Sequence, residues 1–323
     1  MAGTKTGNGK VGGPGVVLVT GAAGFIGRAL CAQLLDEGLR VRALVRRGGR
    51  QLPSEITVRL EKLVEVDDLA GSCPREDILT GVESVVHLAG RAHNRGGDGF
   101  FRDNLDATVA LARGARAAGV RRFIFLSTIK VNGEGVAAAR QTRPYTAADR
   151  PRPQGPYAVS KWRAEQELER LFPPAGATAL TLIRPPLVYG EGVSGNLAGL
   201  KKWLEWGLPL PVPRTANQRS LISRERLVAV ITESLVSSAP ARLLLCSDPE
   251  PWSTAELVRS LAGDGGRFLS LPDGLLRFGF RLLGRPEIYR KLYGSLLIAR
   301  DERERIKIQA GNGAGSGRSF SKR

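Results

Sequence analysis

The first strong pattern in the chain is Val16–Thr20, five apolar or β-branched residues without a charge. Such a run is typical of a strand buried on both faces of a parallel sheet. The next segment, FIGRALCAQLLDEG, has apolar residues at helical spacing. Gly21, Gly24 and Gly27 lie between and across the two segments at three-residue steps. The pattern therefore predicts a strand, a glycine turn and a helix.

The alternation of strands and helices continues to about residue 190. Further strands are predicted at Arg40–Arg46, within 56–66, and at 84–88, 122–127 and Ala179–Arg184. Helical spacing appears in 100–119, a segment that contains Asn104 and Thr108, and again from Tyr157. This order predicts an α/β fold with a Rossmann-like, doubly wound parallel sheet.

The rhythm changes after Gly190. Helices are expected at 196–207 and 223–238, and a strand at 242–246 is expected to return to the first sheet. Ser253 and Glu256 have the spacing of a capping box and open another helix. Segment 271–298 is apolar with interspersed arginines. We interpret it as a packed helix pair, with a substrate lid, a dimer contact and a membrane-surface helix as alternatives.

These segments predict a dinucleotide-binding domain at 15–190 and a smaller substrate-binding region at 191–299, with 241–248 returning to the first domain. Residues 1–14 are glycine-rich, and 300–323 are charged and then Gly/Ser-rich, so both are expected to be disordered tails. The N-terminus lacks the apolar stretch of a signal peptide, and no apolar run reaches membrane-spanning length. We therefore expect a cytoplasmic protein without a transmembrane segment.

Composition narrows the ligand classes. The net charge is +17, but the arginines are spread along the chain and form no dense basic block with interleaved aromatic residues. This argues against nucleic-acid binding and suits anionic ligands such as dinucleotides and nucleotide sugars. The three cysteines are far apart and only two histidines are present, so no metal site is expected.

The glycine turn has the chemistry of a phosphate cradle. Gly21 permits a sharp turn, Gly24 lets the backbone approach a pyrophosphate, and Gly27 lets the helix pack closely on the strand. The free N–H groups at the helix start, at Phe25 and Ile26, then face the phosphates. A glycine-rich connection in an ordinary α/β domain is the alternative, because glycine triplets alone are weak signals.

Other predicted cofactor contacts lie at the ends of later strands. An NAD site usually has an acidic residue after the second strand, where this chain has Arg46. An arginine there favours the 2′-phosphate of NADP, although a solvated edge of a basic protein is an equal alternative. Asp68 and Leu69 are expected near the adenine. Leu88, Ala89 and Gly90 are expected near the nicotinamide ribose. His87 is interpreted as a packed strand residue.

The catalytic chemistry is predicted from Tyr157 and Lys161, which share one helix face at i and i+4. Both are also expected to contact the cofactor, with Lys161 bonding the nicotinamide ribose hydroxyls. The lysine charge favours tyrosinate, so the tyrosine pKa is expected to fall from about 10 toward neutrality. Such a phenol exchanges a proton with a sugar hydroxyl while hydride moves at the same carbon. Ser127 and Thr128 end a predicted strand, and a hydroxyl there polarises the reacting oxygen. YxxxK alone is common on helix surfaces, but the joint pattern with the glycine turn is specific.

Six motifs together carry a family resemblance: TGAAGFIG, HLAGRAHN, FLSTIKVNG, YAVSK, RPPLVYG and QRSLIS. Over about residues 15–298 the chain resembles the NAD-dependent epimerase/dehydratase family of extended short-chain dehydrogenases/reductases, in its UDP-glucose 4-epimerase-like branch. The resemblance implies that Thr128, Tyr157 and Lys161 are catalytic. It also implies a probable UDP-sugar substrate contacted by Ser127, Thr128, Asn196, Leu197 and, at the diphosphate, Arg219. A homodimer is a further possibility.

Departures from the family pattern narrow the reaction. Sugar-nucleotide 4,6-dehydratases have Asp-Glu where this chain has Ile129 and Lys130, so dehydration is not expected. Leu187 replaces the asparagine that the epimerases usually have, and the chain end lacks the family's usual Gly-Trp segment. A nucleotide-sugar 4-epimerase is the first hypothesis, and an NADPH-dependent 4-keto-sugar reductase is nearly equal to it. A non-catalytic dinucleotide-binding scaffold or sensor is the remote third.

Overall fold

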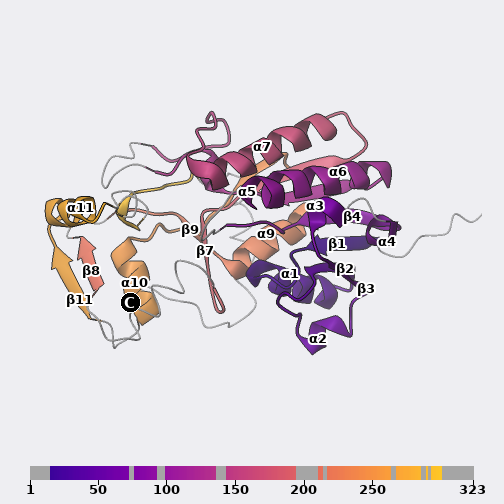
Figure 1. The fold of residues 1–323 in the computed structure, drawn as a ribbon, viewed down its shortest axis with the longest axis horizontal. Coiled ribbons are helices and arrows are strands. Elements are labelled where there is room, and N and C mark those ends of the chain that lie inside the picture. Colours follow the sequence, from indigo (N-terminus) through magenta and orange to yellow (C-terminus); the bar gives the residue numbers. More distant parts are fainter. Residues whose placement is uncertain are drawn as a thin grey trace, which may run out of the picture.

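The computed structural model describes residues 15–72, 76–92, 99–135, 143–193, 210–213, 217–262, 267–284, 289 and 292–299. Figure 1 shows a helix-flanked sheet on one side and a smaller group of C-terminal elements on the other. The predicted tails at 1–14 and 300–323 lie outside the described residues, as does the predicted helix at 196–207.

The centre of the fold is a seven-stranded sheet in the order β10-β6-β5-β4-β1-β2-β3. Every neighbouring pair in it is parallel. Its strands are β1 (Val16–Thr20), β2 (Arg40–Arg46), β3 (Lys62–Val66), β4 (Val82–His87), β5 (Arg122–Leu126), β6 (Ala179–Arg184) and β10 (Leu243–Leu245). The prediction of a Rossmann-like, doubly wound parallel sheet is therefore confirmed. The strand order reverses between β1 and β4, which places the ligand crevice of such sheets at their carboxyl ends.

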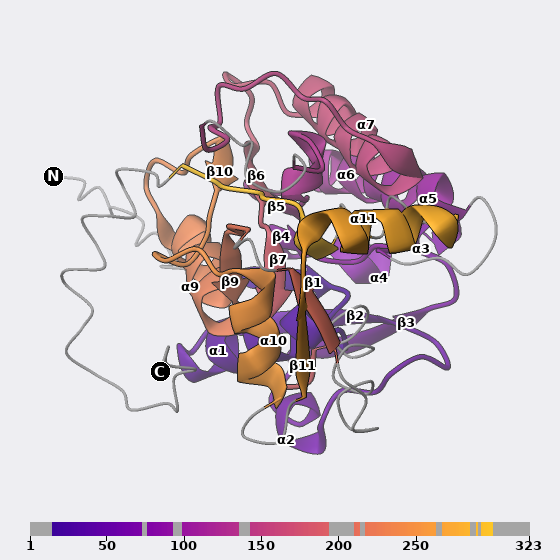
Figure 2. The same cartoon turned by 90° about the vertical axis from the view of Figure 1, so that its left-hand side faces the viewer.

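Helices cover both faces of the sheet (Figures 1 and 2). On one face lie α3 (Leu69–Ser72), α4 (Glu76–Leu79), α6 (Ala107–Ala117) and α7 (Gly155–Leu171). On the other lie α1 (Phe25–Asp36), α2 (Ser54–Thr57) and α9 (Arg224–Val236). Alternate strand residues feed the two cores: Leu18 packs into the first and Val19 into the second. This two-sided burial explains the continuous apolar run of β1, whereas the edge strand β3 (KLVEV) is exposed at three of its five residues.

The remaining elements surround the carboxyl ends of the strands. Short helical pieces α5 (Gly99–Phe101), η1 (Arg102–Asp106) and η2 (Ile129–Val131) precede or follow the main elements. Two small parallel sheets pair β7 (Leu187–Tyr189) with β9 (Leu221–Ser223), and β8 (Leu210–Pro213) with β11 (Phe268–Leu271). The proline pair before Leu187 ends the main ladder as predicted, but the chain then pairs again in a separate sheet.

The C-terminal segment corrects one interpretation. The predicted helix pair does not reach the end of 271–298: α11 (Asp273–Leu282) is a helix, and Tyr289, Leu292 and Tyr293 are helical, but Leu296 and Ile298 are extended and bridge to Arg219 and Tyr145. The extended part is built by backbone bonds such as Ser220 N to Leu296 O, at 2.8 Å. These partners are distant in sequence, so local periodicity gave no sign of them.

The capping box that opens α10 (Thr254–Ala262) is confirmed. Ser253 N donates to Glu256 Oε2 at 2.7 Å, and Glu256 N donates to Ser253 Oγ at 3.1 Å. Within the described part of the chain, no helix combines the length and apolar character needed to cross a bilayer.

Candidate active site

The glycine turn between β1 and α1 has no room for side chains. Gly21 has a φ of +68°, and a Cβ there would lie 2.8 Å from Ala89 N. A Cβ on Gly27 would lie 2.2 Å from Gly21 O, so this residue sets the close approach of helix and turn. Gly24 N donates to Gly21 O at 2.9 Å, and Gly24 is the N-cap of α1 with no side-chain cap bond. The amide groups of Phe25 and Ile26 therefore open α1 without a capping side chain, which suits phosphate binding.

The turn after β4 lies directly against this cradle. Leu88 N donates to Thr20 O at 3.3 Å, and Ala89 N donates to Thr20 Oγ1 at 3.2 Å. A Cβ on Gly90 would lie 2.7 Å from Asn104 Oδ1 and 3.1 Å from Lys161 Nζ. The small residues predicted to border the nicotinamide ribose therefore bring the lysine side chain next to the dinucleotide crevice.

Three predicted catalytic side chains meet at the end of β5. Thr128 follows β5 and is buried, and its hydroxyl is hydrogen-bonded to the half-buried Tyr157 side chain. Lys161 lies one turn further along α7, where its Nζ donates to Leu126 O at 2.9 Å and lies 4.4 Å from the Phe125 ring centre. Ser127 Oγ is buried and, among the described residues, accepts and donates no hydrogen bond. An orphaned hydroxyl beside Thr128 fits a site that takes a polar ligand.

The prediction that the pKa of Tyr157 falls below its usual value is wrong for this arrangement. Burial raises the pKa of Tyr157 to about 12, and the hydrogen bond from Thr128 only partly opposes that rise. Burial also lowers the pKa of Lys161 to about 8, while the charge of Glu165 acts in the other direction. The lysine thus remains largely protonated at neutral pH, but its ammonium group is held by the Leu126 carbonyl and does not offset the burial of the phenol.

A buried polar chain, which sequence reasoning did not assign, supports the site. His87 bonds Thr20 Oγ1 through Nδ1 at 2.7 Å and Thr108 Oγ1 through Nε2 at 2.9 Å. Thr108 in turn donates to Asn104 O at 2.7 Å. The Asn104 amide donates to Ser160 Oγ at 3.0 Å. This series of hydrogen bonds links the glycine cradle to α7. His87 is therefore a packed strand residue, as predicted, and it helps to position the two segments.

Asn104 lies in η1, a π-helical turn, and such turns are frequent at functional sites. Its Oδ1 accepts from Arg91 N at 2.7 Å, and its Nδ2 donates to Arg91 O at 3.0 Å. Because Asn104 is fully buried, these bonds fix the turn that carries Gly90 against Lys161. The sequence signal for this role was the presence of a polar residue, Asn104, on the apolar side of the helix predicted over 100–119.

Burial makes His87 a pH-sensitive element of stability. Burial and the Lys161 charge lower its pKa to about 3, below the unfolded value of 6.5. Below pH 6.5 the unfolded chain therefore binds a proton that the folded chain does not, and stability falls with pH by up to about 1.4 kcal/mol per unit. Urea unfolding between about pH 7.5 and 5.5 should show this slope, and His87→Gln should remove it. The second histidine is present in both proteins, so an equal slope in the variant would contradict the assignment.

The predicted adenine-side residues surround the ends of β2 and β3. Arg46 is 62% exposed and its guanidinium lies 3.7 Å from Asp103 Oδ2. Asp68 accepts from Ala70 N at 3.1 Å and is paired with Arg102, which lowers its pKa despite burial. Leu69 is buried at the start of α3. Sequence reasoning did not single out Asp103, although its carboxylate forms an ion pair with Arg46.

Two of the predicted substrate contacts, Asn196 and Leu197, lie outside the described residues. Arg219 is half-buried, and its Nη1 donates to Gly294 O at 3.2 Å. Burial lowers the Arg219 pKa, whereas the nearby charge of Glu134 raises it. Arg219 is thus a half-buried cation with the charge of Glu134 nearby.

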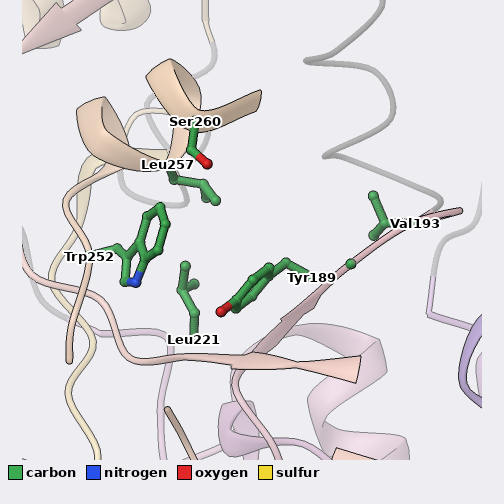
Figure 3. A pocket seen from close by; sticks show the side chains of 7 residues that line it. Tyr189, Val193, Leu221, Trp252, Leu257 and Ser260 are labelled. Atoms are coloured by element: carbon green, nitrogen blue, oxygen red, sulfur yellow. The ribbon is translucent and has the colours of Figure 1, made fainter. Parts of the chain in front are cut away.

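An apolar pocket borders the same side, between β7, β9 and α10 (Figure 3). The Tyr189 and Trp252 rings face each other across it with centres 6.0 Å apart, and Tyr189 Oη donates to Asp248 Oδ2 at 2.6 Å. Gly190, also in its lining, is so close to α1 that a Cβ there would lie 3.5 Å from the Phe25 ring. The pocket therefore adjoins the glycine cradle.

The sequence profile of the NAD dependent epimerase/dehydratase family matches residues 17–209, well over half of the chain. This chain belongs to that family. The family is a group of NAD-dependent enzymes within the short-chain dehydrogenase/reductase superfamily, so the predicted resemblance is confirmed. The match spans the glycine cradle, the β4 turn and the Thr128, Tyr157 and Lys161 group.

Individual relatives agree with the family. A UDP-glucose 4-epimerase from Vibrio cholerae is 34% identical over 88% of this chain and 87% of its own length. A ceramide reductase from Caulobacter vibrioides is 32% identical over 82% of this chain and 76% of its own length. The structure of MoeE5 in complex with UDP-glucuronic acid and NAD has a TM-score of 0.63 and 28% identity, and covers 80% of this chain and 86% of that one.

Proposed function

We propose that this protein is a nucleotide-sugar 4-epimerase that acts on a UDP-sugar by reversible oxidation at C4. The observation that carries the proposal is the meeting of Thr128, Tyr157 and Lys161 beside the Gly21 and Gly90 cradle. The relative with 34% identity, named as a UDP-glucose 4-epimerase, supports the same reaction.

The glycine cradle fits a dinucleotide, because Gly21 and Gly90 let the turns after β1 and β4 and the Lys161 side chain approach one another at the carboxyl end of the sheet. Phe25 and Ile26 amides, with the α1 dipole, would hold the pyrophosphate, and Leu88, Ala89 and Gly90 the nicotinamide ribose. Asp68 and Leu69 would border the adenine. When bound, the nicotinamide supplies the hydride acceptor and donor, and in its oxidised form a positive charge near the phenol.

The protein residues move the proton. Tyr157 takes the proton of the C4 hydroxyl as the C4 hydride leaves, so the sugar carbon becomes a ketone. Thr128 donates to the same oxygen and polarises it. In the return step the phenol gives the proton back while hydride returns to the other face of C4. The raised pKa of Tyr157 keeps the phenol protonated for that step, and the positive charge of an oxidised nicotinamide, when bound, would favour tyrosinate for the first.

Substrate contacts complete the proposal. Arg219 and the basic character of the chain suit the diphosphate, and Ser127 Oγ supplies an unused hydroxyl beside Thr128. Asn196 and Leu197 remain proposed contacts to the nucleotide. The division of the chain into a cofactor domain at 15–190 and a substrate region at 191–299 is part of the same proposal.

A 4-keto-sugar reductase that consumes NADPH is the second candidate. Arg46 favours it, and the relative named as a ceramide reductase shows that reduction occurs among relatives of similar identity. The deciding assay incubates the purified full chain with NAD and UDP-glucose or UDP-N-acetylglucosamine, and in a parallel reaction with NADPH and a nucleotide 4-keto-sugar. Epimerisation predicts the C4 epimer without net cofactor consumption. Consumption of one NADPH for each keto-sugar, with no epimer formed, would support reduction instead.

The cofactor preference gives a separate prediction. If Arg46 pairs with a 2′-phosphate, Arg46→Ala should weaken NADP binding about tenfold, because one charge-assisted bond is lost. NAD binding should change less than about twofold, since NAD lacks that phosphate. Isothermal titration with both dinucleotides checks this, and Arg47→Ala is the matched control one residue further on. Equal losses for NAD and NADP would show that Arg46 serves Asp103 and not the cofactor.

A further inference from the structure

We propose that the outer face of α11 binds the surface of a membrane that contains anionic lipids. The face consists of Leu275, Phe278 and Leu282, which recur at i, i+3 and i+7 and so share one side of the helix. Their exposed fractions are 55%, 62% and 71%, and Leu283 at the helix end is 73% exposed. Large apolar side chains gathered on an outer face mark an interaction site.

The opposite face of α11 is already used. Leu276 is buried with Tyr289 and Tyr293, and Phe280 packs against the same cluster. The helix is therefore firmly placed by its inner face, and its outer apolar residues are not required for packing. In Figures 1 and 2, α11 lies at the end of the molecule away from β3 and α4, with its outer side turned away from the other described elements.

The charges beside this face favour lipid headgroups. Arg281 lies on the flank of the apolar stripe and is exposed, and Arg277 is exposed between the stripe and the inner face, with its guanidinium 5.9 Å from the Tyr289 ring centre. Across 267–284 the chain has three arginines and one aspartate. A helix with an apolar stripe and flanking arginines is typical of one that lies in the plane of a bilayer interface. A basic flank adds attraction to anionic headgroups, which falls as salt is raised.

A second copy of the chain fits this face less well. A two-fold contact through the same stripe would place Arg281 of both copies at the edge of a small apolar centre, with no acidic residue of 274–284 to pair with it. Anionic lipid complements both the apolar stripe and its arginines. Because the face lies at the same end of the molecule as the proposed substrate region, membrane binding would turn that region toward the bilayer.

Flotation of the full chain with lipid vesicles tests the proposal. Wild type should bind vesicles of phosphatidylcholine with about 30% phosphatidylglycerol, and lose that binding with phosphatidylcholine alone. The Leu275→Gln, Phe278→Gln, Leu282→Gln variant should reduce the bound fraction at least about fivefold. Val58→Gln, Val236→Gln is the matched control, because these residues are 81% and 65% exposed on the sheet domain. The control should bind as wild type does.

Three results would overturn the proposal. One is no binding of wild type to anionic vesicles. Another is equal binding of wild type and the α11 variant, which would assign binding to another basic part of the chain. The third is sedimentation velocity showing that wild type is an oligomer and the α11 variant a monomer, which would identify the face as a contact between copies. Circular dichroism and the Tm of each variant should match wild type, because the substituted side chains are exposed.

Discussion

Tyr157→Phe should lower the turnover of the proposed epimerisation by about 1,000-fold, within the range that positioned acid–base groups contribute. The phenol oxygen is the only atom removed, and it is the atom that Thr128 approaches at the end of β5. The aromatic ring, which lies 6.1 Å from the Phe100 ring, is retained. Steady-state assays with the full chain and a UDP-sugar measure the loss.

Two controls make this result specific. Cofactor affinity of the Phe variant should stay within about threefold of wild type, because the proposed pyrophosphate contacts come from α1. Tyr145→Phe removes a second partly buried phenol of the same region. It should leave most of the turnover, because the Tyr145 ring packs in a separate apolar cluster with Ile129 and Leu296. Turnover of Tyr157→Phe equal to that of Tyr145→Phe would remove the phenol from the mechanism.

The second large effect is on stability. Arg184 and Glu165 form an ion pair with side chains only 5% and 2% exposed, and Arg184 also donates to Asn132 Oδ1 at 2.9 Å. Arg184→Met would leave a buried carboxylate without its cation, which costs about 3–5 kcal/mol. The midpoint of urea unfolding should fall accordingly. Since Glu165 lies one turn after Lys161, the same change should also disturb the catalytic face of α7.

The matched control is a pair on the same helix. Arg170 and Glu167 lie 2.7 Å apart but are 73% and 37% exposed. Arg170→Met should therefore cost no more than about 0.5 kcal/mol. A double variant, Arg184→Met with Glu165→Met, should recover much of the lost stability, because no lone charge stays buried. If Arg184→Met were as mild as Arg170→Met, the pair would not be buried in solution.

The sheet domain was the part most readily predicted from sequence. Its central strands, such as β1 and β5, are buried on both faces, so they form apolar runs that stand out in the sequence. The close approach of backbone at Gly21, Gly27 and Gly90 was predictable because glycine is the residue required where no side chain fits. The structure has such tight surroundings at all three. Thr128, Tyr157 and Lys161 were predictable because spacing along one helix and one strand end decides where they meet.

Other features depend on contacts that no local pattern reveals. The extended segment around Leu296 pairs with Arg219, 77 residues earlier, so its helix-like apolar content was misleading. The direction of the Tyr157 pKa was wrong because the prediction counted the Lys161 charge and ignored burial. The roles of Asp103 and Asn104 could not be predicted, because they depend on a π-helical turn between sequence-distant strands. The turn places Asp103 beside Arg46 at the end of β2, and Asn104 against Gly90 after β4.

The most direct test of the central claim follows the hydrogen on C4. UDP-glucose carrying deuterium at C4 is incubated with the purified full chain and catalytic NAD in ordinary water, and the product is examined by NMR. The account predicts UDP-galactose with the deuterium retained at C4, because hydride leaves and returns within one site while Tyr157 exchanges only the hydroxyl proton. UDP-galactose with solvent hydrogen at C4, or turnover unaffected by Tyr157→Phe, would contradict it.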